Sequence, residues 1–242
     1  MIPICGKPLI QGVVERARKA ALLDEVLVAT DDKRILDAVT GMGNKAVMTR
    51  PDHPSGTDRV AEAVQGLAVD VVVNVQGDEP LVEPALIDSL VIMVQTQTEL
   101  DMATAATPIA EESEMNNPSV VKVVWNELGH ALYFSRSPIP YVRDRPGSCE
   151  RGLHWRHVGI YAYRKSFLQR LVKQPPSALE KAERLEQLRA LHIGARIGVV
   201  ETGEQGLGVD TPEDIPRVEE ALRRRIAISN IGNGRELKCR GP

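Results

Sequence analysis

Short apolar runs alternate with amphipathic stretches along most of the 242 residues, and this alternation constrains the fold more than any other feature. The apolar runs have the length of strands and are rich in Val, Ile and Ala, whereas the stretches between them have helical periodicity. Strands that alternate with helices are typical of a largely parallel sheet covered by helices. We therefore predict an α/β fold with a mostly parallel sheet flanked by helices.

The expected elements can be placed along the chain. The predicted strands cover residues 26–30, 46–49, 70–75, 102–109, 120–125, 130–135, 157–163 and 197–201. The predicted helices cover residues 9–22, 33–42, from 57 or 58 to 66, 84–97, 165–173, 177–191 and 212–225. We expect one domain over residues 1–227 with an antiparallel insertion at about 118–164, and a frayed tail at 228–242.

Composition excludes several classes of protein. Apolar residues make up 43% and charged residues 26%, as in a globular protein. A net charge of −3 and an aromatic content of 3% disfavour a nucleic-acid binder. No apolar run reaches the roughly 18 residues of a membrane-spanning helix, and no signal peptide is recognisable. The cysteines Cys5, Cys149 and Cys239 are sparse and far apart, so we expect reduced thiols and a cytoplasmic protein.

Two acidic residues directly follow predicted strands. Asp78 comes after the valine-rich run 70–75, and Asp210 comes after Leu207-Gly208-Val209. Ligands of open α/β sheets bind at the carboxyl ends of the strands, and carboxylates there suit a Mg²⁺ ion that carries phosphates. Either residue could instead cap a turn or helix, and Asp210 precedes ordinary helix-start chemistry. A pair of carboxylates at two strand ends favours the metal site more than either residue alone.

The segment Ser55-Gly56-Thr57-Asp58-Arg59 opens a predicted helix with small hydroxyl side chains and a glycine. Backbone N–H groups at such a start can bind an anion, although an ordinary helix cap has the same sequence. The chain lacks the P-loop and the GxGxxG fingerprint, which disfavours an ATPase or a nicotinamide dehydrogenase.

Basic and polar side chains near later strands are candidates for binding an acidic ligand. His157 opens a strand beside basic residues, and Arg136 follows the hairpin. Arginine pairs with a carboxylate through two hydrogen bonds. Glu186 and Gln187 lie in a helix with leucine spacing, where a solvated face is the ordinary interpretation. Each of these residues alone is more often a surface residue.

Six ordered motifs together resemble one family, the CMP-Kdo synthetases or 3-deoxy-manno-octulosonate cytidylyltransferases. The most specific motif is NVQGDEP at residues 74–80. The others are TRPDHPSGTDR (49–59), ALYFSR (131–136), RHVGIY (156–161), LEQLR (185–189) and GVDTPED (208–214). The resemblance extends to about residue 225 and implies a Rossmann-like nucleotide-diphospho-sugar transferase fold.

The resemblance implies a reaction and its site. CMP would pass from CTP to the acidic sugar 3-deoxy-D-manno-octulosonate (Kdo), releasing pyrophosphate, for lipopolysaccharide biosynthesis. Asp78 and Asp210 would be catalytic ligands of Mg²⁺, in a homodimer joined largely through the insertion. The implied sugar-acid residues are Gln76, Arg136, His157, Tyr161, Glu186 and Gln187, and the implied nucleotide residues are Ser55, Gly56, Thr57 and Arg59.

The resemblance departs at the N-terminus. Family members begin with a strand and a loop of the type RxxSxRLPGKPL, whereas ICGKPLI at residues 4–10 matches only the end of that loop. We expect the first strand and the phosphate loop to be missing. Without this strand, the edges of neighbouring strands and a Val-rich strip would be uncovered. Without the loop, we expect the chain to have little activity. The alternatives are a cytidylyltransferase for another acidic sugar, or an inactive homologue that acts as a binding or dimerisation subunit.

Overall fold

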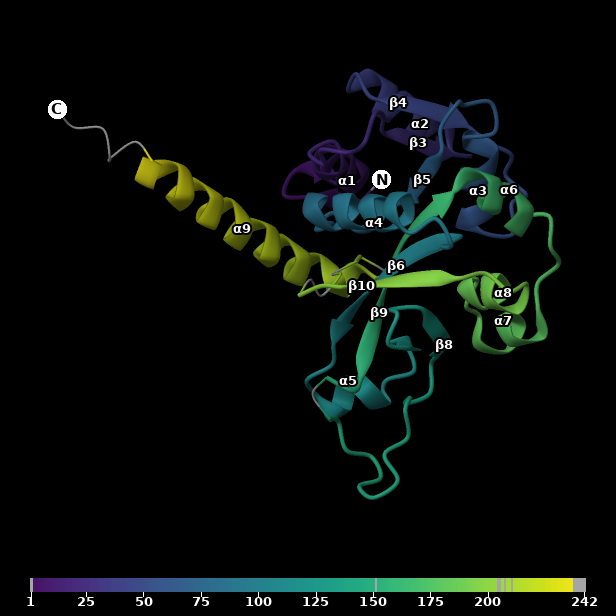
Figure 1. Cartoon of the computed structure of the whole chain (residues 1–242). Helices are drawn as coiled ribbons and strands as arrows, with labels where there is room; N and C mark the ends of the chain where they lie inside the picture. Colours follow the sequence, from purple (N-terminus) through teal and green to yellow (C-terminus); the bar gives the residue numbers. More distant parts are fainter. Residues whose placement is uncertain (1, 151, 204–205, 207, 210, 237–242) are drawn as a thin grey trace.

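The computed structural model of the chain describes residues 2–150, 152–203, 206, 208–209 and 211–236. Strands and helices alternate along most of it, and helices flank the sheets (Figure 1). The α/β class predicted from the alternation of apolar runs is confirmed.

The strands match the sequence prediction to within two residues at either end. They are β3 (Leu27–Thr30), β4 (Lys45–Met48), β5 (Val71–Asn74), β6 (Met102–Pro108), β7 (Lys122–Trp125), β8 (Ala131–Ser135), β9 (Trp155–Arg164) and β10 (Ile197–Glu201). Two short strands, β1 (Pro3–Ile4) and β2 (Lys7–Pro8), pair antiparallel before the first helix. The helices are α1 (Leu9–Ala17), α2 (Lys33–Gly41), α3 (Gly56–Ala63), α4 (Pro84–Thr96), α5 (Glu112–Asn116), α6 (Lys165–Leu171), α7 (Ala178–Glu183), α8 (Gln187–His192) and α9 (Ile215–Glu236).

The main sheet has six strands and is mixed. Its strands β6 and β10 pair parallel, while β9 pairs antiparallel with β5, β6 and β7. Because β5 and β6 both oppose β9, they run in the same direction, as a parallel sheet requires. The prediction of mostly parallel pairing is corrected in this respect: the antiparallel insertion returns through the sheet and places β9 between two parallel strands.

A groove separates β3 from β5. Within the described residues, β3 pairs only with β4, and β5 pairs only with β9, so each has one edge without a strand partner. A cavity of about 550 Å³ lies between them and is lined by side chains of α1 and α3 as well as both strands. Val71 and Val73 of β5 are only partly buried. The uncovered strand edges and the Val-rich strip expected from the sequence are thus confirmed.

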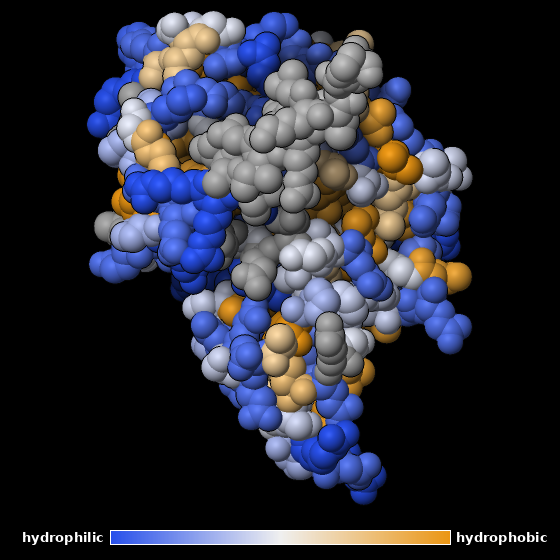
Figure 2. Space-filling model, turned by 90° about the vertical axis from the view of Figure 1, so that its left-hand side faces the viewer, coloured by the Kyte–Doolittle hydropathy of each residue, from blue (hydrophilic) through white to orange (hydrophobic). Residues whose placement is uncertain are grey.

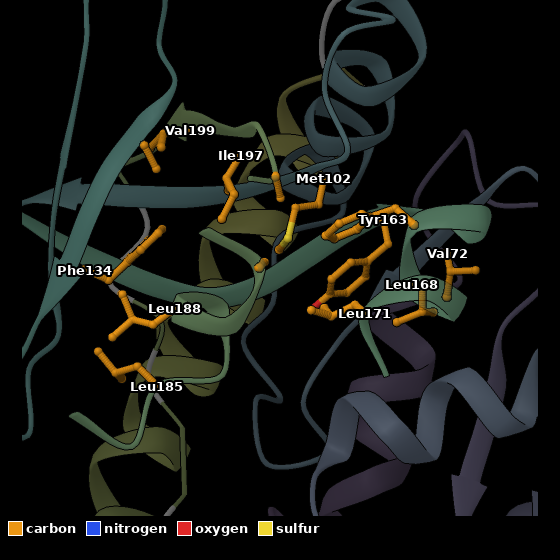
Figure 3. Close-up of a cluster of buried hydrophobic side chains, with 14 of the residues drawn as sticks. Val72, Met102, Phe134, Tyr163, Leu168, Leu171, Leu185, Leu188, Ile197 and Val199 are labelled. Carbon is orange, nitrogen blue, oxygen red and sulfur yellow. The ribbon is translucent and has the colours of Figure 1, made fainter. Parts of the chain in front are cut away.

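Helices pack on both faces of the main sheet and bury two apolar clusters. On one face α4 places Ile87, Leu90 and Val94 against β6 and β9. On the other face, residues of α6 and α8 pack with Phe134, Met102 and Ile197 from the strands, among the side chains drawn in Figure 3. Burial of this aliphatic surface is the main favourable term in folding, and it fixes β9 between the two helix layers.

Several helices differ from the predicted ones: α5 has no predicted counterpart, and α3 ends at Ala63 rather than residue 66. The helix predicted at 177–191 is broken, because Arg184 adopts φ +53° and the chain turns before α8 begins at Gln187. Leu185 enters the core at this turn, which compensates for the lost helical hydrogen bonds. α1 ends at Ala17 rather than residue 22. α9 runs to Glu236, beyond residue 225, and projects from the body in Figure 1.

None of the helices in the described part of the chain is both long enough and apolar enough to cross a membrane.

Gly198 of β10 provides a test of the core packing. A Cβ at this position would lie 2.6 Å from the Met93 sulfur and 2.7 Å from a methyl carbon of the buried Leu100. We expect Gly198→Ala to lower the free energy of unfolding by about 1–3 kcal/mol, because a close-packed core cannot absorb an added methyl group without strain. Urea denaturation measures this change. Gly66→Ala is the control, since a Cβ there has no neighbour within 4 Å; equal effects of the two substitutions would contradict the packing described.

Candidate active site

β9 brings three of the sequence motifs to one region of the sheet. Its Tyr161 lies opposite Asn74 of β5 and opposite Thr104 of β6, while His157 lies opposite Ala106. Asn74 is the first residue of the NVQGDEP motif, and the next residues leave the strand toward Asp78. The pairing register therefore places the 156–161 motif beside the 74–80 motif, two segments that are about 80 residues apart in the chain.

His157 is buried, and its environment keeps the imidazole neutral. Burial lowers the pKa of His157 to about 3. Its Nε2 lies 2.9 Å from the Thr104 hydroxyl oxygen, which is also 2.8 Å from the Ile160 carbonyl oxygen. Because Thr104 has one hydroxyl proton and the Ile160 carbonyl can only accept, both contacts are satisfied when Nε2 carries the imidazole proton and donates to Thr104. This assignment leaves Nδ1 as a hydrogen-bond acceptor.

Partly buried Tyr161 and buried Gln187 form a second pair beside His157. The rings of His157 and Tyr161 lie 5.5 Å apart, and the Tyr161 hydroxyl donates to Oε1 of Gln187 at 3.2 Å. Burial, the neighbouring Tyr163, and the carboxylates of Glu186 and Glu79 raise the pKa of Tyr161, so the phenol stays protonated. Within the described residues, the buried Nε2 of Gln187 has no hydrogen-bond partner. The pair thus offers an amide donor whose hydrogen bonds the protein does not satisfy.

Arg136 directly follows β8, and hydrogen bonds to several segments hold it in place. Its backbone N–H donates to Oε2 of Glu183 at 2.9 Å. Its Nε donates to the Glu183 carbonyl at 2.7 Å, and Nη1 donates to the Pro118 carbonyl at 2.9 Å. No described residue forms a hydrogen bond with Nη2. Part of the guanidinium therefore supports the fold, and the rest remains available to a ligand.

Asp78 lies in the loop after β5, as predicted, and residue 209 binds its backbone. The N–H of Val209 donates to the Asp78 carbonyl at 3.0 Å, and a Cβ on Gly208 would lie 3.7 Å from the same oxygen. Asp210 itself is outside the described residues, but its neighbour Val209 is thus in contact with Asp78. Gln76 is partly buried at the start of this loop. Nowhere in the described ranges do three or more His, Cys, Asp or Glu residues cluster as metal ligands would.

The segment 55–59 starts α3 at the edge of the groove. The Ser55 hydroxyl caps the helix by accepting from the Asp58 N–H at 3.3 Å. Thr57 is buried and hydrogen-bonds with the Tyr163 side chain, whereas a Cβ on Gly56 would face open space. Arg59 pairs with Asp31 at 3.1 Å and donates to the Thr49 hydroxyl at 2.8 Å. The helix cap given as the ordinary interpretation is present, and binding of an anion at this helix start stays a prediction.

Ion pairs connect the segment 55–59 to the motif 185–189. The buried guanidinium of Arg189 lies 3.1 Å from Glu180 and 3.9 Å from Asp58. The Arg189–Asp58 pair therefore places α8 near the start of α3, so the two motifs lie close together.

Sequence reasoning missed Thr104, Lys122 and Glu183. Thr104 orients His157, and Glu183 and Lys122 bind the backbone of Arg136. A lysine inside the apolar run at 120–125 was a usable signal, because a charged residue there is either at an edge or buried with partners. No such signal pointed to Glu183, because charged residues are common on the exposed faces of helices.

The chain belongs to the cytidylyltransferase family, whose sequence profile matches residues 1–197. It is 48% identical over 227 residues to the 3-deoxy-manno-octulosonate cytidylyltransferase of Geobacter sulfurreducens, an alignment that covers 91% of each chain. The enzyme of the same name from Syntrophotalea carbinolica is 49% identical, with 91% of this chain and 90% of that one covered.

Solved structures give the same result. A CMP:2-keto-3-deoxy-manno-octonic acid synthetase complexed with CTP superposes with a TM-score of 0.87 at 44% identity, covering 93% of this chain and 91% of that one. A 4-diphosphocytidyl-2C-methyl-D-erythritol synthase from Anaerococcus prevotii has a TM-score of 0.59 at 14% identity, covers 92% of each chain, and shares the fold. The predicted family and the nucleotide-diphospho-sugar transferase type of fold are confirmed.

The protonation state of His157 can be measured directly. Because burial holds its pKa at about 3, the imidazole stays neutral from pH 5 to pH 9. An unfolded histidine titrates near 6.5, so the contribution of His157 to stability is complete above that pH and is lost as the pH falls toward 3. We expect the His157 ring resonances in NMR spectra to stay constant from pH 5 to pH 9, and a midpoint near 6.5 would contradict the burial described.

Proposed function

We propose that the protein transfers CMP from CTP to Kdo and releases pyrophosphate, in support of lipopolysaccharide biosynthesis. The observation that carries the proposal is the position of β9, which lies between β5 and β6 and joins the 156–161 motif to the loop of Asp78. Relatives with identities of 48–49% over nine-tenths of the chain carry the name of this activity.

The acidic sugar binds in our proposal near His157, Tyr161 and Gln187. The free Nη2 of Arg136 provides a cationic donor for the sugar carboxylate, and charge-assisted bonds of this kind are the stronger ones. Nδ1 of His157 accepts from a sugar hydroxyl, and Nε2 of Gln187 donates to a sugar oxygen. We assign Glu186 to the same region because its carboxylate raises the pKa of Tyr161, and we assign Gln76 to it because Gln76 closely follows Asn74, which lies opposite Tyr161.

The nucleotide binds along the start of α3. The backbone at Gly56 is open and can present an N–H group, Ser55 and Thr57 shape the helix start through their bonds to Asp58 and Tyr163, and Arg59 supplies positive charge next to the groove. The groove passes from this helix to Gln76 and Gly77 and thus connects the nucleotide residues to the loop of Asp78.

Asp78 and Asp210 are the residues that would hold a Mg²⁺ ion. The bond from Val209 to Asp78 brings the two loops together, and carboxylate oxygens are suitable ligands for a hard cation. When bound, such an ion neutralises phosphate charge and lowers the pKa of a coordinated hydroxyl. The protein positions the sugar hydroxyl in line with the departing pyrophosphate, and it needs to supply little covalent chemistry itself.

The insertion is the surface through which we propose that the chain forms a homodimer. Large apolar side chains are exposed on it: Leu128, Leu132, Tyr141 and Leu153. Figure 2 shows hydrophobic patches among hydrophilic ones on the tapering lower part of the molecule, where Figure 1 places α5 and β8. Exposed apolar patches of this kind mark association surfaces. A cytoplasmic location, expected from the cysteines, stays a prediction.

A second candidate function is that of a binding or dimerisation subunit without catalysis. The groove between β3 and β5 favours it, because two strand edges beside the nucleotide region are uncovered. Pyrophosphate release from CTP, Mg²⁺ and Kdo by the 242-residue chain separates the two candidates: turnover excludes the inactive subunit, and a folded chain without turnover excludes the enzyme. Replacing Kdo by an N-acylneuraminate in the same assay tests for another acidic sugar.

The metal role of Asp78 is tested by Asp78→Asn in a chain that shows turnover. We expect kcat/KM to fall by about 100-fold or more, because the substitution removes a negative charge that binds the cation. The analogous Asp210→Asn should act in the same way. Asp144→Asn, which changes an exposed carboxylate on the insertion, is the control. Near-normal activity of Asp78→Asn, with Mg²⁺ dependence unchanged, would remove Asp78 from the metal site.

The sugar-acid role of Arg136 is tested by Arg136→Lys. Lysine keeps the charge but lacks the planar fork of donors, so it cannot bind Glu183, Pro118 and a carboxylate together. We expect the KM for Kdo to rise about tenfold while the KM for CTP changes less than about twofold. Equal increases in both KM values would assign Arg136 to the fold alone.

A further inference from the structure

Lys122 is a buried cation that the proposed reaction does not use. It belongs to β7, and none of its side chain is exposed to solvent. Its ammonium donates to three backbone carbonyls, those of Asn117 at 3.1 Å, Val120 at 2.7 Å and Arg136 at 2.6 Å. In the part of the chain that the structure describes, no carboxylate forms an ion pair with it. Burial and the nearby Arg136 lower its pKa.

A buried charge of this kind is costly unless its hydrogen bonds are satisfied. An apolar residue of similar size would avoid the cost of the buried charge, but it would remove the donor from three backbone carbonyls. The three carbonyls explain how the charge is tolerated. They do not explain why a charged residue occupies this position, and the residues that Lys122 binds indicate its role.

Arg136 is the residue at which these contacts converge. Lys122 holds the Arg136 carbonyl, and the Glu183 carboxylate holds the Arg136 N–H on the other side of the same residue. The second oxygen of Glu183 accepts from the Ser135 hydroxyl at 2.7 Å. Both backbone groups of Arg136 are therefore bound by charged side chains from two different elements, β7 and α7.

The same two residues also fix the acceptors of the Arg136 side chain. Nε of Arg136 donates to the backbone carbonyl of Glu183, at the C-terminal end of α7. Nη1 donates to the carbonyl of Pro118, and Lys122 binds Asn117, directly before Pro118, and Val120, two residues after it. Lys122 and Glu183 thus hold the segments that accept from two guanidinium nitrogens of Arg136. These two bonds fix the plane of the guanidinium and therefore the direction of Nη2.

We propose that Lys122 and Glu183 are positioning residues that hold the Arg136 guanidinium in the orientation that binds the carboxylate of the acidic sugar. The inference rests on the proposed function, because it takes Arg136 as the carboxylate-binding residue. Lys122 and Glu183 touch neither substrate; they act only through Arg136. The affinity for the sugar acid should therefore depend on both residues, and the affinity for CTP should not.

A double-mutant cycle between Lys122 and Arg136 tests the proposal. Methionine matches the length of lysine without its donors, so the proteins are the unchanged chain, Lys122→Met, Arg136→Ala and the double variant. The measured quantities are the KM values for Kdo and for CTP. We expect Lys122→Met to raise the KM for Kdo about tenfold and to change the KM for CTP less than twofold. In the Arg136→Ala background, Lys122→Met should change the KM for Kdo less than about twofold.

The outcomes distinguish the inference from the proposed function. If Arg136→Ala leaves the KM for Kdo unchanged, Arg136 does not bind the sugar acid and the residue assignment in the proposed function fails. If Arg136→Ala raises that KM while Lys122→Met does not, the positioning role of Lys122 is wrong. Equal effects of Lys122→Met on both KM values, or additive effects in the cycle, would indicate a purely structural role.

Glu183→Gln supplies an independent arm should Lys122→Met fail to fold. It keeps the size of the side chain but removes the charge that binds Ser135 and the Arg136 N–H. We expect a three- to tenfold rise in the KM for Kdo at an unchanged KM for CTP, and an unchanged KM for Kdo would overturn the proposal. Lys181→Met, at an exposed position on α7, is the matched control and should change neither KM.

Discussion

The pairing of β9 between β5 and β6 is the constraint on which the candidate site depends. β9 pairs antiparallel with β6 on one side and with β5 and β7 on the other, so its register determines which side chains face each other. A slip by one residue would turn His157 and Tyr161 to the opposite face of the sheet. Apolar clusters on both faces of the sheet oppose such a slip, since the same shift would move Ile160 and Ala162 out of the cluster that they form with α4.

Much of the fold could be predicted from local patterns. The run of valines before Asn74 indicates a buried strand, and its abrupt end indicates the edge where ligands bind. The position of β9 could not be predicted in this way, because an antiparallel strand and a parallel one have the same apolar pattern. Only pairing between segments about 80 residues apart decides the direction, and local propensity carries no information about it.

The sequence indicates which residue types are candidates for the site, but not their protonation or hydrogen bonding. His157 and Arg136 were predicted to bind an acidic ligand from residue type alone. The structure adds that burial keeps His157 neutral and that carbonyls bind two nitrogens of the Arg136 guanidinium. Sequence periodicity suggested one helix where Arg184 breaks it in two. The break allows Leu185 to enter the core, and it places Gln187 where its side chain accepts from the Tyr161 hydroxyl.

The groove between β3 and β5 separates the fold into two units that can open independently of each other. β3 and β4 form a two-stranded sheet whose hydrogen bonds are separate from those of the six-stranded sheet. The contacts between them run through helices and through side chains such as the Arg59–Asp31 pair. A unit joined in this way opens at a lower free energy than the central strands do. We expect amides of β3 and β4 to exchange with solvent faster than those of β9, and a nucleotide bound at Arg59, as proposed, to slow that exchange.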